Sequence, residues 1–202
     1  MAKLKQVGSA ERMKAKDRAA LMVQEADRQI NEERSARISP PEIAASIGSS
    51  RSLVYSYFPD ADHLIQAVLD RHADLLMQAG LCDALDAESL EDAVVQSSLI
   101  YCDHVTKYGA AIELCLREPR VAEKVGGKIR MLILSVLLRL GRKAMQELKF
   151  EPADALATVR ILQVVPEDAA RLIRSGKVSR EIAQKVCRRL IRASLDELRP
   201  MT

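Results

Sequence analysis

The chain has 202 residues with 31 basic and 28 acidic side chains, so its net charge of +3 does not by itself mark a nucleic-acid-binding protein. This length can bury a core without cross-links, and the 4 widely spaced cysteines favour free thiols over a disulfide framework or a zinc cluster. The most apolar window, 131–138, is too short to cross a bilayer, and the first residues lack the apolar block of a signal peptide. We therefore expect a cytoplasmic protein with no membrane span.

Almost every segment between helix breakers has helical periodicity, with no two-residue alternation and no sequence repeat, which predicts an all-α fold. The first helix is expected from Ala10 to Glu33. Its apolar stripe consists of Ala19, Met22, Val23, Ala26 and Ile30. Basic residues gather at the amino end of the chain, where an arm can contact a polyanion; they are Lys3, Lys5, Arg12, Lys14, Lys16 and Arg18.

The stretch "ISPPEIAASIG" predicts a short helix with well-marked ends. Ser39 and Glu42 have the spacing of a capping box, and Pro40 occupies the first helical position, where a missing N–H has no consequence. Gly48 is expected to end the helix in the left-handed conformation. Two short helices joined by a glycine turn have the dimensions of a helix-turn-helix.

The second short helix is expected over residues 50–57, with Ser49 or Ser50 as its cap. Its inward side is predicted to carry Val54, Tyr57 and Phe58. The opposite side then carries small hydroxyls, one guanidinium and one phenol, from Ser50, Arg51, Ser52 and Tyr55. Serine and arginine reach base edges in the major groove, and serine and tyrosine hydroxyls bind phosphate oxygens. This side therefore has the chemistry of a DNA-binding surface.

Further helices follow to the end of the chain. Asp60 is expected to cap a long helix over 61–78, whose buried stripe consists of Leu64, Ile65, Val68, Leu69, Ala73 and Leu76. The later helices are predicted at 89–106, 110–116, 119–148, 152–174 and 179–198. The window 131–138 is apolar on all sides, which predicts a centrally packed helix, and Pro166 is expected to kink or divide its segment.

The last helix has an apolar stripe that needs a partner surface. The stripe consists of Ile182, Ala183, Val186, Cys187, Leu190, Ile191, Leu195 and Leu198. The charges opposite it make a second nucleic-acid surface conceivable, but one apolar stripe with charges behind it is more typical of a dimer interface.

The motifs between residues 10 and 72 resemble the DNA-binding domain of the TetR family of transcriptional regulators. They are Ile43-Ala44, Gly48-Ser49-Ser50-Arg51, Val54-Tyr55-Ser56-Tyr57-Phe58-Pro59 and Leu64, after a long first helix and a Ser39 cap. The resemblance implies a three-helix DNA-binding domain at 1–60, a connecting helix at 61–79 and a helical-bundle domain for effector binding and dimerisation at 80–202. It further implies a homodimeric repressor, closed by its last two helices, that binds a palindromic DNA operator and is released by a small-molecule effector.

On this resemblance the DNA contacts are expected at Ser39, Pro40, Ser49, Ser50, Arg51, Ser52, Tyr55 and Tyr57. The chain also departs from the family pattern. Ala61 stands where a phosphate-binding lysine is usual, and the flanking Asp60 and Asp62 would repel DNA unless they face away. Ser49 replaces a usual apolar turn residue, and Ser52 replaces a common glycine.

No pattern of a catalytic or metal site is complete. Residues 48–52 lack the last glycine of a nucleophile elbow. Gly126-Gly127-Lys128 resembles the end of a phosphate-binding loop, but Ala122 stands where the first glycine of that loop is needed, and Ile129 stands where serine or threonine is needed. The histidines have no metal-ligand spacing among themselves or with the cysteines. We expect no enzyme, no metal site and no cofactor.

The candidate ligand-pocket residues are Tyr101, His104, Tyr108, Cys115 and Leu134, for which ordinary core packing is an equally good explanation. The scarcity of aromatic rings favours an aliphatic or modest-sized effector. Two alternatives stay open. One is a helical small-molecule-binding or protein-interaction module without operator binding, and the other is a DNA-binding protein whose core is filled and binds no ligand.

Overall fold

The computed structural model describes residues 15–199, and in this part of the chain every regular element is a helix. The helices are α1 (Ala15–Glu33), α2 (Pro40–Ser46), α3 (Arg51–Tyr57), α4 (Ala61–Gln78), α5 (Leu81–Leu85), α6 (Leu90–Tyr108), α7 (Ala111–Arg117), α8 (Pro119–Ala122), α9 (Gly127–Glu147), α10 (Pro152–Leu162), α11 (Val164–Arg174) and α12 (Arg180–Glu197). The all-α prediction is confirmed.

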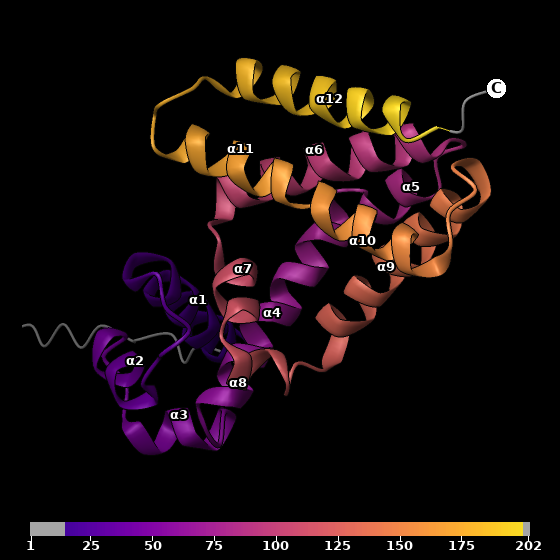
Figure 1. The fold of residues 1–202 in the computed structure, drawn as a ribbon. Helices are drawn as coiled ribbons and strands as arrows, with labels where there is room; N and C mark the ends of the chain where they lie inside the picture. The colour runs from indigo at the N-terminus through magenta and orange to yellow at the C-terminus, as the bar shows by residue number, and fades with distance from the viewer. Residues whose placement is uncertain (1–14, 200–202) are drawn as a thin grey trace, which may run out of the picture.

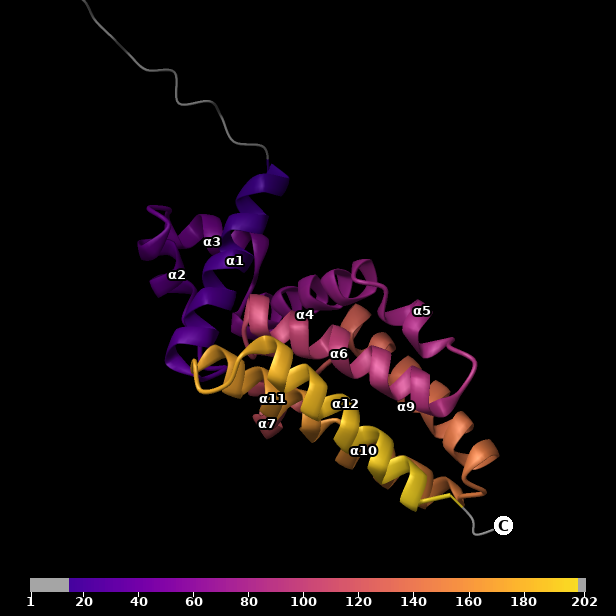
Figure 2. The same cartoon turned by 90° about the horizontal axis from the view of Figure 1, so that it is seen from above.

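The helices form a small unit and a larger bundle (Figure 1). Helices α1, α2 and α3 pack together at one end of the molecule, and α4 runs from this unit into the bundle of α5 to α12. Helices α11 and α12 lie side by side along one face, both against α6, as two perpendicular views show (Figures 1 and 2). Helix α9 packs against α4 on one side and α10 on another.

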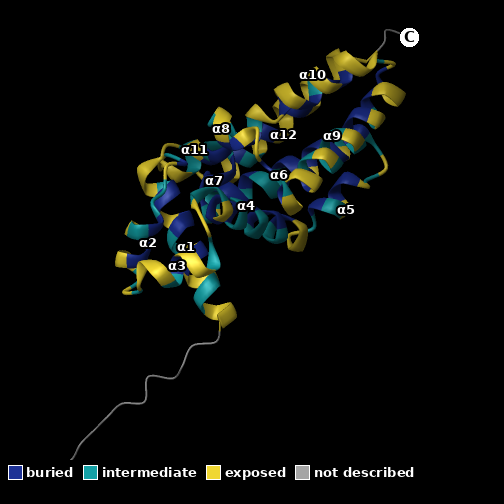
Figure 3. Ribbon diagram, turned by 90° about the horizontal axis from the view of Figure 1, so that it is seen from below, coloured by how far each residue is buried: buried dark blue, intermediate teal, exposed yellow. Residues whose placement is uncertain are grey.

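The predicted apolar stripes of the first helices form the core of the small unit and its junction with α4. In α1, Met22, Val23, Ala26 and Ile30 are buried, while Ala19 is half-buried. The whole predicted stripe of α4 is buried. Dark blue residues in Figure 3 follow these inward sides, and exposed residues follow the outer sides of the same helices.

The segment 119–148 contradicts its prediction in two respects. It forms two helices rather than one, because the chain turns at Gly126 and Gly127 to bind side chains of α4: Gln66 Oε1 accepts from the Gly126 N–H at 2.9 Å, and Asp70 Oδ1 accepts from the Ile129 N–H at 3.0 Å. Gly127 has φ +56°, and an added Cβ would lie 2.4 Å from Asp70 Oδ2.

Helix α9 is also not central. It lies at the outside of the bundle, where Met131 and Leu138 are 69% and 66% exposed. Its apolar residues continue around the helix, so periodicity did not distinguish the buried side, which carries Leu132, Leu140 and Ala144, from the exposed one. The short α5 was not predicted.

The division at Pro166 is confirmed. Helix α10 ends at Leu162 and α11 begins at Val164, because a proline at 166 has no N–H to continue the hydrogen bonding of the preceding turn. All four cysteines are free, and Cys82 alone among them is half-buried rather than buried. Within residues 15–199 no helix is both long enough and apolar enough to span a bilayer.

Candidate nucleic-acid interface and ligand cavity

The turn between α2 and α3 has the geometry of a helix-turn-helix. Gly48 adopts φ +64°, which ends α2 in the left-handed conformation as predicted. Ser39 is the N-cap residue of α2, but its side chain makes no capping hydrogen bond, so the expected capping box is wrong. The Ser39 carbonyl alone accepts from the N–H groups of Glu42 and Ile43, at 2.9 and 3.0 Å. Pro40 is the first helical residue and is buried.

Helix α3 is fixed at both ends by short-range contacts. The Ser50 hydroxyl accepts a hydrogen bond from the Leu53 N–H at 3.2 Å, so Ser50 is the cap. Val54 is fully buried, while Tyr57 and Phe58 are half-buried and pack on the core with ring centroids 6.5 Å apart. The rings therefore support α3 from the inner side.

The outer side of α3 is open to solvent. Ser50, Arg51, Ser52 and Tyr55 are all exposed, Tyr55 by 44%, and Ser49 is half-buried in the turn. Arg51 has no ion-pair partner among residues 15–199. A short helix with hydroxyls, a free guanidinium and a phenol on one exposed side can enter a major groove and hydrogen-bond both bases and phosphates.

A hydrogen-bonded contact holds the helix-turn-helix against α1. The Ser46 hydroxyl at the end of α2 donates to Glu25 Oε1 at 2.5 Å, and the Arg28 guanidinium is 2.6 Å from the same oxygen. The hydrogen bond from Arg28 lowers the pKa of Glu25 to about 2. The glutamate is therefore ionised at neutral pH and positions α2 on the long helix behind it.

The two aspartates beside Ala61 are engaged within the protein. Asp60 caps α4 by accepting from the His63 N–H at 2.9 Å, and this hydrogen bond lowers the pKa of Asp60. Asp62 faces α8 and its following loop, where Lys124 Nζ is 2.7 Å away and Arg120 is 3.8 Å away. The charge of Asp62 is thus matched by neighbouring cations, which removes much of its repulsion of DNA.

A buried polar chain joins α1, α4 and α6. His72 of α4 is fully buried; its Nδ1 lies 2.8 Å from Nε2 of His104 on α6, and its Nε2 lies 3.0 Å from Oδ1 of Asp27 on α1. Arg71 donates to Oδ2 of the same Asp27 at 2.8 Å. One carboxylate of the small unit therefore holds two consecutive side chains of α4.

The protonation state of His104 follows from its surroundings. Burial, with the neighbouring His72 ring, lowers the pKa of His104 to about 3, so this ring is neutral at physiological pH. Because the Asp27 carboxylate can only accept, the His72 Nε2–H donates to it, and one proton is shared between His72 Nδ1 and His104 Nε2.

A second contact of α1 continues this connection. The Asn31 side chain accepts from the Ala110 N–H at 2.7 Å and donates to the Tyr108 carbonyl at 3.3 Å, so α1 holds the turn between α6 and α7. Gly109 lies in this turn with φ +96°, and an added Cβ would lie 2.0 Å from Asn31 Oδ1. The close approach of α1 to this turn requires glycine.

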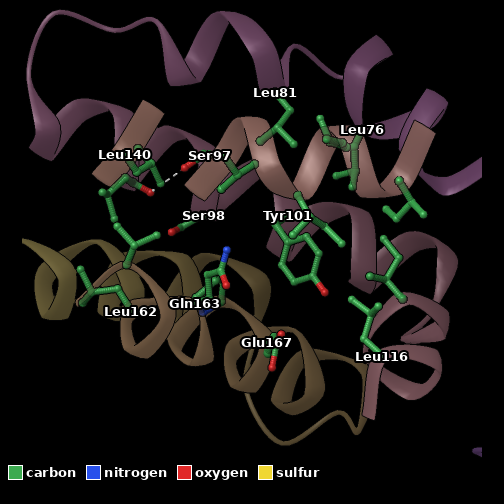
Figure 4. A pocket seen from close by; sticks show the side chains of 18 residues that line it. Leu76, Leu81, Ser97, Ser98, Tyr101, Leu116, Leu140, Leu162, Gln163 and Glu167 are labelled. Atoms are coloured by element: carbon green, nitrogen blue, oxygen red, sulfur yellow. Dashed lines mark hydrogen bonds between the residues drawn. The ribbon is translucent and has the colours of Figure 1, made fainter. Parts of the chain in front are cut away.

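The larger bundle contains a cavity of about 170 Å³ that is partly open to solvent. Its walls are mainly aliphatic and come from seven helices, with representative residues Leu76 (α4), Leu81 (α5), Val94 (α6), Leu116 (α7), Leu140 (α9) and Leu162 (α10), while α11 contributes Pro166 and Glu167. Polar side chains also line it: Ser97, Ser98 and Tyr101 of α6, Gln163 and Glu167 (Figure 4).

Of the five predicted pocket residues, only Tyr101 lines this cavity. His104 and Cys115 are buried in the core, where His104 is bonded to His72. Tyr108 lies in an open polar cleft beside Asn31 and Arg71, with Arg71 5.9 Å from its ring centroid. Leu134 is 44% exposed on the outer side of α9. These four positions share a stretch of sequence with cavity residues but point to other sides of their helices.

Two further surfaces bear on function. Arg12, Lys14, Lys3 and Lys5 of the expected basic arm lie outside the described residues. On α12, Ala183, Cys187, Ile191 and Leu195 are buried against the bundle, whereas Ile182, Val186 and Leu190 are 56%, 48% and 52% exposed. The predicted stripe is therefore divided between a buried side and an exposed side of α12. The exposed residues Ile182, Val186 and Leu190 form an apolar ridge on the surface.

The solved structures that resemble this fold are transcriptional regulators. A TetR-like regulator from Rhodococcus sp. RHA1 has a TM-score of 0.69 and 17% identity, over 92% of this chain and 99% of its own. A TetR-family regulator from Streptomyces coelicolor has a TM-score of 0.55 and 25% identity, over 89% and 79%. AibR, solved with isovaleryl coenzyme A and operator DNA, has a TM-score of 0.61 and 15% identity, over 85% and 96%.

These matches confirm the predicted resemblance to TetR-family regulators at the level of the fold, a helix-turn-helix unit followed by a helical bundle. No protein-family model matches the chain, and no curated protein matches it significantly.

Sequence reasoning missed the His72–His104 pair and the Glu167 carboxylate. The two histidines are 32 residues apart, and neither has a local motif. Glu167 follows Pro166 in a charged segment that is typical of a solvated surface. Only the packing of α11 on α6 turns this carboxylate toward the cavity, so no pattern in the sequence marked it.

Proposed function

We propose that this chain, which has the fold of the TetR-family transcriptional regulators, is a homodimeric repressor that binds a palindromic DNA operator in the cytoplasm and releases it when a small molecule occupies the bundle. The observation that carries the proposal is the exposed side of α3, where Ser50, Arg51, Ser52 and Tyr55 face solvent while Val54 is buried behind them. The small unit, 1–60, binds DNA; α4 connects it to the effector and dimer domain, 80–202.

The DNA contacts divide by chemistry. Arg51 has the reach and the bidentate donors to read a guanine, and Tyr55 and the serine hydroxyls bind phosphate. Ser39 and Ser49 lie at the ends of α2 and contact the backbone beside the groove. Pro40 is buried and Tyr57 is half-buried, so these two residues hold α2 and α3 in position and make little direct contact with DNA.

The dimer is formed through α11 and α12. The ridge of Ile182, Val186 and Leu190 has a spacing of four residues, so it is one continuous side of α12, and a symmetric partner would cover it with the same ridge. We expect Leu190→Glu to yield monomers in analytical ultracentrifugation. Leu138→Glu on α9 is the matched control: Leu138 is 66% exposed and lies on another face, so this variant should stay dimeric. A monomeric wild type, or dimers in both variants, would contradict this interface.

Release requires that the two recognition helices change their separation. They must lie about 34–36 Å apart to enter successive major grooves. Three residues separate the end of α3 from the start of α4, and the other end of α4 contributes Leu76 to the cavity wall. An effector that favours a shifted position of α4 therefore lowers operator affinity, and the operator must lower effector affinity by the same factor.

Selection of bound duplexes from a random pool tests the function. We expect a palindrome whose half-sites are one helical turn apart, bound with an affinity that falls steeply with salt. Failure to enrich any duplex, with a small molecule still bound in the cavity, would support the second candidate, a helical small-molecule-binding module without operator binding; the aliphatic cavity is the observation that favours it.

A further inference from the structure

The size of the cavity limits its occupant. Its volume is about 170 Å³, close to that of the roughly 150 Å³ apolar cavities that bind benzene in another protein. A molecule with on the order of ten non-hydrogen atoms fills such a space. A larger ligand would have to extend out of the open side of the cavity.

The walls of the cavity limit its shape and polarity. Tyr101 supplies the one aromatic ring in the lining, and the remaining apolar walls are leucine, isoleucine, valine and proline. Such walls give no flat surface on which a second ring can stack. They favour an aliphatic body, whose burial is driven by the hydrophobic effect.

The polar groups of the cavity have unused hydrogen-bonding capacity. Ser97 is satisfied, because its hydroxyl donates to the Ala93 carbonyl at 2.6 Å. The side chains of Tyr101, Gln163 and Glu167 have no hydrogen-bond partner among residues 15–199. Figure 4 shows the hydroxyl end of Tyr101 turned toward α11, the helix that carries Glu167. A ligand placed between them can donate to the carboxylate and accept from the phenol.

The charge of the cavity limits the charge of the ligand. Glu167 is the one ionisable acid or base in the lining besides Tyr101, and no lysine, arginine or histidine lines it. Burial, and next the Glu113 carboxylate, raise the pKa of Glu167. The nearby Arg117 is paired with Glu113 at 2.6 Å and its side chain is 71% exposed, so it does not supply a positive charge inside. A ligand carboxylate would lie beside Glu167 with no counter-ion.

From this geometry we infer that the cavity binds a small, mainly aliphatic molecule without negative charge, with a hydroxyl or equivalent donor that bonds to Glu167, with Tyr101 donating to its oxygen, and that it rejects the corresponding carboxylate. This inference rests on the proposed function for its regulatory meaning, but the binding itself is independent of DNA. It separates the ligand from acyl carboxylates, whose negative group finds no counter-ion in the lining.

Isothermal titration calorimetry on the full chain, without DNA, tests the inference with two probes that share one ring: cyclohexylmethanol and cyclohexanecarboxylate. We expect the alcohol to bind at least about tenfold more tightly than the carboxylate, since the carboxylate must be desolvated beside Glu167 with no counter-ion in the lining. Equal or tighter binding of the carboxylate, or no binding of either probe, would overturn the inference.

Two substitutions test which side chains cause the preference for the alcohol over the carboxylate. Glu167→Gln should reduce the preference for alcohol over carboxylate to less than about threefold, because it removes the repelling charge and keeps an acceptor. Tyr101→Phe should weaken the alcohol several-fold. Asp168→Asn is the matched control: the neighbouring residue on α11 does not line the cavity and pairs with Arg171, so both affinities should be unchanged. An unchanged preference in Glu167→Gln would overturn the assignment to Glu167.

The outcome is separable from that of duplex selection. Alcohol binding without operator binding would refute the regulator and leave the ligand site in place. Operator binding with no alcohol binding would refute the ligand site and leave the regulator in place.

Discussion

The outer side of α3 and the cavity of the bundle differ in every property that decides what they can bind. Helix α3 offers hydroxyls, a guanidinium and a phenol to solvent, whereas the cavity is mainly aliphatic with one carboxylate. The first suits a polyanion and the second excludes an anion. The two regions therefore cannot share a ligand. Helix α4, which follows α3 and contributes Leu76 to the cavity wall, connects them, and α1, which holds the turn between α6 and α7, is a second connection.

Helix α4 is held on two sides by different chemistry. On one side Asp62, Gln66, Asp70 and Asp74, spaced four apart, bind α8, its following loop and α9. On another side Arg71 and His72 bind Asp27 of α1, and His72 also binds α6. Polar contacts of this kind have defined geometry, so α4 is expected to move between discrete positions and to carry α1 with it.

The largest expected effect is the loss of Asp27. Asp27→Ala leaves a fully buried His72 and a partly buried Arg71 without their shared partner, which should lower the free energy of unfolding by about 3 kcal/mol. Urea denaturation measures it. Glu32→Ala on the same helix removes an exposed pair with Arg28 and should change stability by less than about 1 kcal/mol. Equal losses in both variants would show that the buried contact has no special role.

A smaller effect is expected where α1 meets the turn after α6. Gly109→Ala places a methyl group against Asn31 at a backbone angle that side chains rarely adopt, and it should destabilise the fold by about 2 kcal/mol. Gly141→Ala is the matched control in α9, where nothing lies within 4 Å of the added Cβ. This change should stabilise the helix by about 0.5–1 kcal/mol. Thermal and urea unfolding of both variants measure these changes. An unchanged free energy of unfolding in Gly109→Ala would contradict the account.

The pH dependence of stability should reveal the neutral ring of His104. Its pKa is about 3 in the folded protein against 6.5 in the reference state, so the unfolded chain binds the extra proton first as the pH falls. Stability should therefore decrease below about pH 6.5, by at most about 1.4 kcal/mol per pH unit from this group.

Measurement between pH 6.5 and 5 avoids Glu25, whose contribution is lost only as the pH falls from its usual 4.5 toward about 2. His104→Gln should flatten the slope in this window, and the exposed His63→Gln should not. An unchanged slope in His104→Gln would contradict the neutral assignment.

The difference between the two regions also explains what the sequence could predict. The helix-turn-helix depends on signals within a few residues: Pro40 at a helix start, Gly48 at a left-handed turn, Ser50 and Asp60 as caps. Each has a local physical cause, so the helix bounds and the exposed side of α3 were predictable. The side-chain bond of the Ser39 capping box was not formed, which shows that spacing alone does not fix a rotamer.

The cavity depends on residues far apart in the chain. Leu76 and Leu162 meet only after seven helices have packed, and Glu167 faces inward because α11 lies on α6. His72 and His104 approach for the same reason. Helix α9 has apolar residues on every side, so its buried side was set by its neighbours. Long-range packing of this kind leaves no pattern in a single sequence.

The central claim is that the exposed side of α3 reads DNA, and the binding of Arg51→Ala and Tyr55→Phe to the selected operator and to a scrambled duplex, across salt concentrations, tests it most directly. We expect Arg51→Ala to lose about 1–3 kcal/mol on the operator alone, and Tyr55→Phe to weaken both duplexes alike by a smaller amount. Equal, sequence-blind losses from both substitutions, or unaltered binding, would contradict the account.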